Sequence, residues 1–196
     1  MPLAVAFPVF PGAEELDLAG PFEAFALARD YGEQEIELFT AAASPEPVRL
    51  RGGLRVQPDF AFAGAPAADV IVVPGGPGTR DETSWPPVVA WLQSRRNTPL
   101  VASVCTGAFL LARAGLLDGL SATTHHARVD ELREQHPSVQ IVRGLRVVDQ
   151  GRVVTAGGVT AGIDLGLHLV GRLFGLDLAG RIGQAMEYPP DRALPF

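Results

Sequence analysis

Short apolar runs alternate along the chain with segments whose apolar residues recur at helical spacing. This alternation predicts a mostly parallel β-sheet with helices on both of its faces. The predicted strands cover residues 3–10, 36–40, 70–73, 100–104 and 153–156. The predicted helices cover residues 22–28, 88–94, 107–114 and 161–174. The strands at 70–73 and 100–104 are apolar throughout, as strands covered on both faces are, so we place them at the centre of the sheet.

Two further segments have the pattern of tight antiparallel turns. The first is centred on Gly52 and Gly53 and the second on Gly151, each between short runs of strand character. Excursions of this kind usually lie at the edge of a sheet. The chain has no internal repeat and no long linker, so we expect one domain over residues 1–196.

Four loops that follow predicted strands carry the unusual residues of the chain. They cover residues 11–21, 74–78, 105–106 and 157–160. In a sheet of this kind, ligands bind beyond the carboxyl ends of the strands. Because the carboxyl ends of parallel strands meet at one edge of the sheet, we expect these loops to converge on one pocket.

Cys105 is the only cysteine, and it lies where an apolar run ends and a helical run begins. A strand that runs into Cys105 and a helix that starts at Thr106 or Gly107 would form a turn like the nucleophile elbow of hydrolases. The first N–H groups of that helix would favour thiolate over thiol. A lone cysteine can also be a small buried hydrophobic residue. Its position after a central strand favours a nucleophile.

Asp17 stands between two leucines, just before Gly20 and Pro21, where a helix can start or bend. An aspartate near a helix start often caps the helix. If the first loop reaches Cys105, burial would instead raise the pKa of Asp17. The carboxyl group could then hold a proton for a substrate or share one with the thiolate. The residues alone leave both roles open.

Gly75 and Gly76 belong to a Pro-Gly-Gly-Pro-Gly loop after a predicted central strand. Glycines let the backbone approach a ligand closely and can aim N–H groups at developing negative charge, as in an oxyanion hole. A tight turn from strand to helix explains the same residues. The loop alone therefore does not decide between a structural and a functional role.

The adjacent residues His125 and His126 invite comparison with a metal site, which we reject. Neighbouring side chains point apart on a strand or helix, and no cysteine pair or carboxylate has the spacing of a metal ligand. We expect instead that one of the two histidines acts as a neutral base or hydrogen-bond donor near Cys105.

Charge and composition narrow the possible partners and the location. The chain of 196 residues has 16 basic and 22 acidic residues, a net charge of −6 and no large basic cluster, so nucleic acid is not expected as a partner. Its apolar runs are too short to span a membrane, and its start lacks the basic region of a signal peptide. A single cysteine cannot form an internal disulfide, in keeping with a reducing compartment. We therefore expect a cytoplasmic protein.

Several motifs occur in the order seen in a known family. They are Asp17-Leu-Ala-Gly-Pro-Phe-Glu, Val-Pro74-Gly-Gly, Ser103-Val-Cys-Thr-Gly-Ala, Ala122-Thr-Thr-His, Ala156-Gly-Gly-Val-Thr-Ala-Gly-Ile-Asp164 and Met186-Glu-Tyr-Pro-Pro-Asp-Arg. Through them the chain resembles the ThiJ/PfpI superfamily over nearly its whole length, and within it the isonitrile hydratase branch. The resemblance implies a flavodoxin-like three-layer α/β sandwich with a class I glutamine amidotransferase-like core. It also implies a cysteine at a nucleophile elbow and a homodimer.

The resemblance assigns roles to individual residues. It implies the nucleophilic thiolate at Cys105, the neighbouring acid at Asp17 and a required hydroxyl at Thr106, while Gly76 and the Thr106 amide resemble the oxyanion pair. The other expected pocket residues are Gly75, Thr124, His125 and Thr160. Proteolytic members carry histidine directly after the cysteine, and Thr106 occupies that place, so peptidase activity is not expected.

The implied activity is that of a hydro-lyase without cofactor or metal, which adds water to an isonitrile and releases an N-substituted formamide. Two alternatives remain open. One is glyoxalase or deglycase activity on reactive carbonyls, and the other is a non-catalytic redox or small-molecule sensor. Each of the three functions has a small molecule as its partner, with neither nucleic acid nor a membrane.

Overall fold

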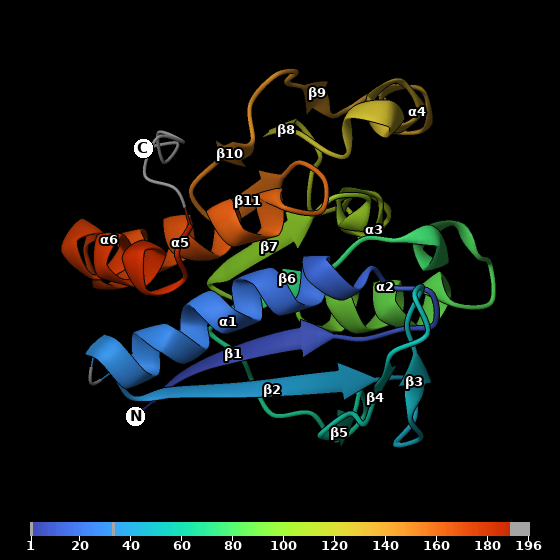
Figure 1. Ribbon diagram of the computed structural model, residues 1–196. Helices are drawn as coiled ribbons and strands as arrows, with labels where there is room; N and C mark the ends of the chain where they lie inside the picture. Colours follow the sequence, from blue (N-terminus) through green and yellow to red (C-terminus); the bar gives the residue numbers. More distant parts are fainter. Residues whose placement is uncertain (1, 33, 189–196) are drawn as a thin grey trace.

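A seven-stranded sheet, mostly parallel, forms the middle of the molecule in the computed structural model, which describes residues 2–32 and 34–188 (Figure 1). The strand order is β10-β11-β7-β6-β1-β2-β5, and every neighbouring pair is parallel except β10 and β11. The strands are β1 (Leu3–Pro8), β2 (Ile36–Ala42), β5 (Phe60–Ala61), β6 (Val70–Val73), β7 (Leu100–Val104), β10 (Val147–Asp149) and β11 (Val153–Ala156). Two separate pairs are β3 (Val48–Arg49) with β4 (Arg55–Val56), and β8 (Ser121–Ala122) with β9 (Gln140–Ile141).

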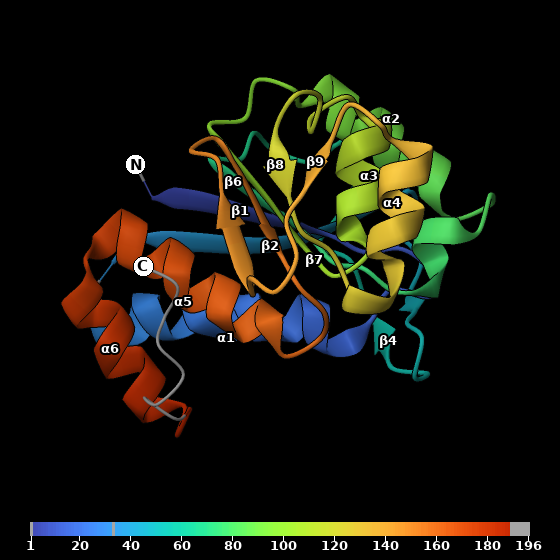
Figure 2. The ribbon, with the colours of Figure 1, turned by 90° about the horizontal axis from the view of Figure 1, so that it is seen from above.

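Helices cover both faces of the sheet and complete three layers (Figure 2). They are α1 (Glu15–Gly32), α2 (Trp85–Ser94), α3 (Gly107–Arg113), α4 (Val129–Gln135), α5 (Ala161–Phe174), α6 (Leu176–Ala185) and the short 3-10 helices η1 (Pro77–Arg80) and η2 (His126–Arg128). Helices α1, α5 and α6 lie on one face, and α2 and α3 lie on the other (Figure 2). The flavodoxin-like three-layer sandwich expected from the sequence is confirmed.

The central strands are where the sequence predicts them. Every residue of β6 and β7 is buried, because helices cover these strands on both faces. The predicted bounds of β6, β7, β11 and α5 match the observed bounds. Long apolar or amphipathic runs therefore carry enough information to place an element to the residue.

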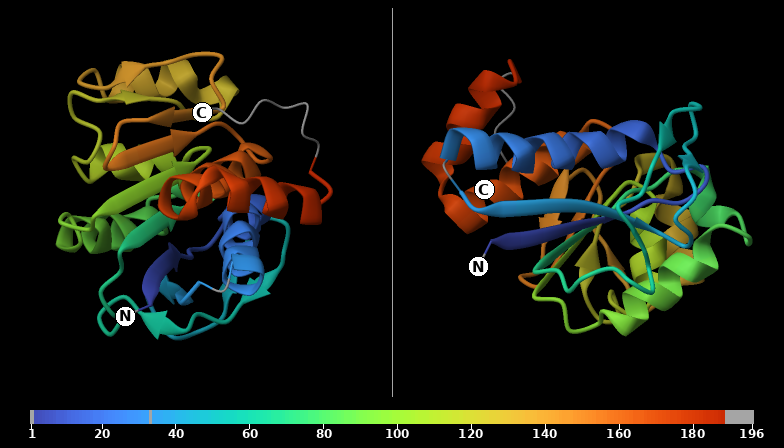
Figure 3. Two further views of the ribbon diagram at one scale, coloured as in Figure 1. Left: turned by 90° about the vertical axis from the view of Figure 1, so that its left-hand side faces the viewer. Right: turned by 90° about the horizontal axis from the view of Figure 1, so that it is seen from below.

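Helix α1 begins earlier than the sequence suggests and continues through Pro21. The reason is the contact with α5, which lies beside α1 on the same face (Figure 3). A Cβ atom added at Gly166 would lie 2.8 Å from the Cα of Pro21, so the two helices approach each other closely at this point. The burial of Gly20 and Pro21 in this contact extends the helix over residues that read as a start or bend.

The two predicted turns have different places in the fold. The second one joins the antiparallel strands β10 and β11 and lies at a sheet edge, as expected. The first joins β3 and β4, which form a sheet of their own, so its expected place at the edge of the main sheet is wrong. It extends instead beyond the carboxyl end of β2. There the backbone N–H of Arg51 donates a hydrogen bond to the carbonyl of Ala13.

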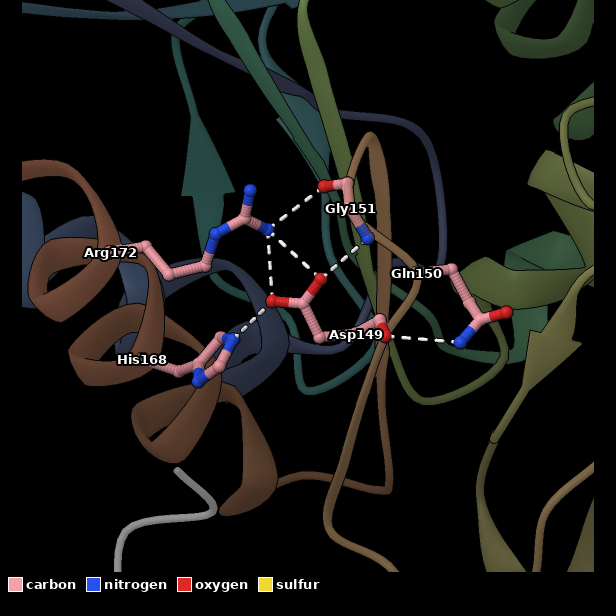
Figure 4. Close-up of polar contacts among 5 residues, drawn as sticks. All are labelled: Asp149, Gln150, Gly151, His168 and Arg172. Carbon is pink, nitrogen blue, oxygen red and sulfur yellow. Dashed lines mark hydrogen bonds and ion pairs between the residues drawn. The ribbon is translucent and has the colours of Figure 1, made fainter.

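The Asp149 carboxylate connects the β10–β11 turn to α5, and both of its oxygens have polar partners (Figure 4). Asp149 accepts hydrogen bonds from His168 Nε2 at 2.7 Å and from the Gly151 N–H at 2.7 Å, and it forms an ion pair with Arg172 at 2.9 Å. Burial alone would raise the pKa of Asp149, but these hydrogen bonds and the charge of Arg172 outweigh it and lower that pKa. His168 thus joins α5 to the β10–β11 turn.

Candidate active site

The loops after β1, β6, β7 and β11 meet at the carboxyl edge of the sheet, as the parallel order predicts (Figure 1). They enclose part of a cavity of about 330 Å³ that contains the Cys105 side chain. The residues that line it are Glu14, Arg51, Gly76, Pro77, Arg80, Cys105, Thr106, His125, Arg128 and Val159. A cavity of this volume has room for a small molecule.

Cys105 stands on a strained backbone turn between β7 and α3. Its φ angle is 57°, in the left-handed region that residues other than glycine seldom adopt. The Cys105 N–H donates to the carbonyls of Ala156 at 3.1 Å and Gly157 at 2.8 Å, and the Thr124 hydroxyl donates to the Cys105 carbonyl at 2.8 Å. These bonds hold the turn, which has the strand-turn-helix form of a nucleophile elbow.

Asp17 is fully buried in the first turn of α1. Its Oδ2 accepts a hydrogen bond from the Gly75 N–H at 3.0 Å, while its Oδ1 has no hydrogen-bond partner among the described residues. The carboxyl group is therefore directed away from its own helix terminus and toward the loop after β6. Of the two roles that the sequence left open, the geometry does not support the cap.

Asp17 and Cys105 form a coupled pair. Burial raises the pKa of Asp17 to about 7, and this exceeds the lowering by the Gly75 N–H. Burial and the negative charge of Asp17 raise the pKa of the Cys105 thiol to about 12. Because the charge of one group disfavours the charge of the other, Asp17 loses its proton only near neutral pH while the thiol keeps its own, so above about pH 7 the pair retains one proton and carries one negative charge.

The state of Cys105 differs from the expectation that the helix N-terminus favours its thiolate. The Thr106 N–H does lower the pKa of the thiol, but burial and Asp17 act more strongly in the opposite direction. The thiolate therefore becomes available when the shared proton is on Asp17. The helix terminus alone does not produce it.

Gly75 comes so close to Asp17 and Thr106, and Gly76 so close to the backbone of the loop after β1, that neither has room for a side chain. A Cβ atom at Gly75 would lie 2.5 Å from the Thr106 nitrogen and 2.9 Å from Asp17 Oδ2. Gly76 has a φ angle of 117°, and its N–H donates to Thr106 Oγ1 at 2.9 Å. The Thr106 hydroxyl in turn donates to the Gly76 carbonyl at 3.2 Å. Thus the Gly76 N–H orients the Thr106 side chain in this state, and the Thr106 N–H acts on the thiol.

His125 lies in the wall of the cavity with its Nδ1 already occupied. The Ala127 N–H donates to His125 Nδ1 at 3.2 Å, so the neutral ring carries its proton on Nε2 and can donate from there. Burial first, and then the positive charges of His126, Arg128 and Arg80, lower the pKa of His125 and keep the ring neutral. The expectation that the two histidine rings point apart is wrong: their centroids lie 4.4 Å apart, because the chain begins a 3-10 helix there.

Three expected pocket residues do not line the Cys105 cavity: Gly75, whose N–H binds Asp17, Thr124 and Thr160. Thr124 is buried behind the elbow, holds the Cys105 carbonyl and lines a neighbouring cavity of about 410 Å³. Thr160 is exposed at the start of α5, and its hydroxyl accepts a hydrogen bond from Arg146 at 3.1 Å. The structure does not bring Thr160 to the thiol. The Thr160 hydroxyl is bonded instead to Arg146, which forms an ion pair with Asp164.

The cavity contains residues that sequence reasoning did not single out. Glu14 is largely buried and forms an ion pair with Arg51 at 3.0 Å. Val159 has a φ angle of 50°, unusual for a β-branched residue, and its backbone lowers the pKa of both Asp17 and Cys105 through hydrogen bonds. Arg80 and Arg128 complete the wall. Only the place of Val159 after a glycine pair in a loop hinted at a role.

Two features are absent from the part of the chain that the structure describes. Within residues 2–32 and 34–188, no three histidine, cysteine, aspartate or glutamate side chains are grouped closely enough to hold a metal ion. Over the same part of the chain, none of the helices combines the length and the apolar character needed to cross a bilayer.

Comparisons with known proteins agree with this architecture. The profile of the DJ-1/PfpI family matches residues 4–172. An isonitrile hydratase from Pseudomonas putida is 36% identical over 198 residues, which span 100% of this chain and 82% of that protein. The HTH-type transcriptional regulator GbdR from Pseudomonas aeruginosa is 30% identical over 95% of this chain, which spans only 51% of the regulator. The crystal structure of a ThiJ/PfpI family protein from Pseudomonas syringae superimposes with a TM-score of 0.84 at 30% identity, covering 100% of this chain and 78% of that one.

Proposed function

Because the chain belongs to the DJ-1/PfpI family, we propose that it uses the Cys105–Asp17 pair to hydrate an isonitrile to an N-substituted formamide. The observation that carries the proposal is a buried thiol on a strained elbow beside a buried carboxyl group that exchanges its proton near pH 7. Such a pair can supply a nucleophile and an acid together. The full-length similarity to an isonitrile hydratase supports this reaction over others that the same pair could perform.

The first half of the reaction joins sulfur to the terminal carbon of the isonitrile. With the shared proton on Asp17, the Cys105 thiolate attacks that carbon and forms a C–S bond. Asp17 then gives its proton to the same carbon, which becomes the C–H of a thioimidate, R–N=CH–S–Cys105. The carboxylate that remains is the base for the second half. Its pKa near 7 suits both roles, because the group exchanges its proton readily at neutral pH.

The second half releases the formamide. Water adds to the thioimidate carbon, so that its hydroxyl group joins the carbon and its other proton reaches nitrogen through Asp17. The C–S bond then breaks, the sulfur leaves as thiolate, and the hydroxyl proton passes to Asp17 as the formamide carbonyl forms. The sum is addition of one water molecule, with no change of oxidation state that would require another reactant.

Backbone N–H groups stabilise the charged states in this scheme. The Thr106 N–H already acts on the Cys105 sulfur, and it stays beside the adduct as charge develops there. The Gly76 N–H holds the Thr106 hydroxyl at 2.9 Å, at the wall of the same cavity. We assign the Thr106 hydroxyl a positioning role for the substrate nitrogen or for water, held in place by Gly76.

The direct test measures formamide formed from a simple alkyl isonitrile by wild-type protein, Cys105→Ala and Asp17→Asn. We expect both substitutions to lower turnover by at least about 10³-fold, since each removes a reacting group. Asp177→Asn, which changes an exposed aspartate on α6, is the matched control and should retain the wild-type rate.

Full activity in either active-site variant contradicts the mechanism. If the wild-type protein leaves isonitriles unchanged but consumes methylglyoxal in a manner that requires Cys105, the glyoxalase alternative replaces the hydratase. Stoichiometric oxidation of Cys105 without turnover of either substrate would favour a redox sensor.

A further inference from the structure

The wall of the Cys105 cavity is rich in arginine, although the protein as a whole is acidic. Three arginines, Arg51, Arg80 and Arg128, line the cavity together with one acidic residue, Glu14, while the chain has a net charge of −6. The guanidinium group pairs preferentially with carboxylate and phosphate oxygens. The cationic lining is therefore a local feature that the average charge of the surface does not explain.

Two of these arginines have acidic partners within the protein, and one does not. Arg51 pairs with Glu14 at 3.0 Å, and Arg128 pairs with Glu131 at 3.1 Å. Arg80 is half-buried and makes no hydrogen bond or ion pair among the described residues. The other described arginines without a partner, Arg49, Arg55 and Arg96, are all exposed to solvent. Arg80 is thus the one arginine of the described residues whose side chain is partly buried and yet has no hydrogen-bond or ion-pair partner. Burying a charge without a partner costs free energy, so this arrangement calls for an explanation.

Arg80 is held in place by its own element. It ends η1, the short helix that follows Gly76, and the preceding residue Thr79 accepts a hydrogen bond from Arg113 at 2.6 Å through its carbonyl. Arg113 in turn lies over the ring of Trp85, 4.7 Å from its centroid. The backbone that carries Arg80 is therefore anchored, and the guanidinium group projects from a fixed point.

The positive charge of Arg80 acts on other residues of the Cys105 cavity. The positive charges of Arg128 and Arg80 both contribute, after burial, to the lowered pKa of His125, which lines the same cavity. Two guanidinium groups consequently act on one region of the cavity wall. An anion bound there would meet Arg80 directly and Arg128 beside it, a few side chains from the thiol.

We infer that Arg80 binds a carboxylate of the substrate, so that the substrates are isocyano carboxylates and the products N-formyl amino acids or related formamido acids. This inference rests on the proposed function for the reacting group and on the arginines for the anion. A singly charged carboxylate fits better than a phosphate, because the Cys105–Asp17 pair and Glu14 already place negative charge in the site. Arg80 would fix one end of the substrate and thereby direct the isocyano carbon toward Cys105.

The kinetic test compares isocyanoacetate with its uncharged methyl ester. For wild-type protein we expect kcat/KM to favour the carboxylate at least tenfold. Arg80→Gln should reduce this preference about tenfold or more, mainly through KM, because it removes a charged hydrogen-bond partner. Arg80→Lys, which keeps the charge but loses the fork of donors, should retain part of the preference. The matched control is Arg55→Gln, which removes an exposed arginine on β4 and should keep the wild-type ratio.

A second measurement does not depend on isonitrile chemistry. Iodoacetate and iodoacetamide alkylate Cys105 with the same leaving group but differ in charge, and intact mass gives both rates. We expect the ratio of the iodoacetate rate to the iodoacetamide rate to fall at least fivefold in Arg80→Gln and to stay unchanged in Arg55→Gln. Thermal melts of each variant verify that it is folded, and Arg80→Lys serves if Arg80→Gln is not.

The two measurements separate the two proposals. If both isocyano compounds are hydrated but neither the preference nor the alkylation ratio depends on Arg80, the carboxylate site is wrong and the hydratase stands. If neither compound is hydrated but the alkylation ratio still falls in Arg80→Gln, the anion site stands and the reaction must be another. An unchanged alkylation ratio overturns the anion site in every case.

Discussion

The pKa values of two aspartates in this chain, the partly buried Asp149 and the buried Asp17, are shifted in opposite directions. Asp149 has a hydrogen-bond or ion-pair partner at each of its carboxylate oxygens, and its pKa is lowered (Figure 4). Asp17 is fully buried and has no cation as a partner among the described residues, so burial outweighs the hydrogen bonds that lower its pKa, and this pKa is raised to about 7. The first arrangement stabilises a turn, whereas the second keeps a proton exchangeable at neutral pH.

The difference shows how one fold separates stability from chemistry. At the β10–β11 turn, a cation and two hydrogen-bond donors compensate the charge, so the native state gains from ionisation. At the elbow, the ionisable neighbours that act on Asp17 are Glu14 and the Cys105 thiol, and a negative charge on either disfavours the carboxylate. Ionisation there costs folding free energy, and the same cost makes the proton available to a reacting molecule.

The largest stability effect that we expect from this comparison belongs to Asp17→Asn. A rise of the Asp17 pKa from 3.8 to about 7 corresponds to as much as about 4 kcal/mol. Between about pH 4 and pH 7 the native state keeps a proton that the unfolded state has lost, so the contribution of Asp17 to stability decreases as the pH rises. Asparagine cannot ionise, and the variant should therefore be more stable than wild type by about 2–4 kcal/mol at pH 8, but not at pH 4.

Urea denaturation at the two pH values measures this effect. The difference in unfolding free energy between Asp17→Asn and wild type should grow as the pH increases from 4 to 8. Asp177→Asn, at an exposed site, should show no such growth. A stability difference for Asp17→Asn that is the same at both pH values would show that Asp17 is ionised in the native state throughout.

Asp149→Asn should have a smaller effect of opposite sign. Asparagine keeps one acceptor oxygen but loses the negative charge and has an NH2 donor in place of the second oxygen, so it satisfies His168 and Arg172 only in part, and we expect a loss of about 2 kcal/mol at pH 7. Because the pKa of Asp149 is lowered in the native state, this contribution is present above about pH 4 and disappears as the pH falls through the native pKa. Thermal and urea unfolding at pH 7 and pH 3 measure it.

Turnover provides the contrast for Asp149→Asn. The residue lies outside the Cys105 cavity, so the folded variant should hydrate isonitriles at close to the wild-type rate. A large loss of kcat in fully folded Asp149→Asn would mean that the turn and the elbow are coupled, and the separation of stability from chemistry would be wrong.

The elements of the elbow were predictable from the sequence, but its electrostatics were not. The apolar runs at 70–73 and 100–104 predict central strands. Because the loops after parallel strands meet at the carboxyl edge of the sheet, the sequence also predicts that Cys105, Asp17 and Gly75 lie at one edge. Whether Cys105 is a thiol or a thiolate depends on the balance between burial, Asp17 and the Thr106 N–H. That balance follows from distances, which spacing along a chain does not contain.

The arginines of the cavity illustrate the same limit. Arg51, Arg80 and Arg128 come from the β3–β4 turn, from η1 and from η2, and they are far apart along the chain. Arg51 and Arg128 stand outside any run of charges, and Arg80 begins only the short run Arg80-Asp81-Glu82, so the charge pattern along the chain does not single them out. Short elements such as β8 and β9, with two residues each, could not be predicted either, because they are too short to show a hydrophobic period. Tertiary contacts alone place such residues.

Thr124→Val is the smallest change that we expect to be informative about the elbow. The substitution nearly preserves volume and removes the hydroxyl that donates to the Cys105 carbonyl at 2.8 Å, leaving that buried acceptor only the long hydrogen bond from the Ala108 N–H at 3.5 Å. We expect a loss of about 1–2 kcal/mol in unfolding free energy and a several-fold drop in kcat with little change in KM. The reason is that the hydroxyl supports a backbone turn with a φ angle of 57° and does not line the Cys105 cavity. Thr160→Val, at an exposed hydroxyl bonded only to Arg146, is the control that should leave turnover unchanged. If Thr124→Val lost stability but kept full kcat, the strain at Cys105 would be maintained by the backbone bonds to Ala156 and Gly157 without help from Thr124.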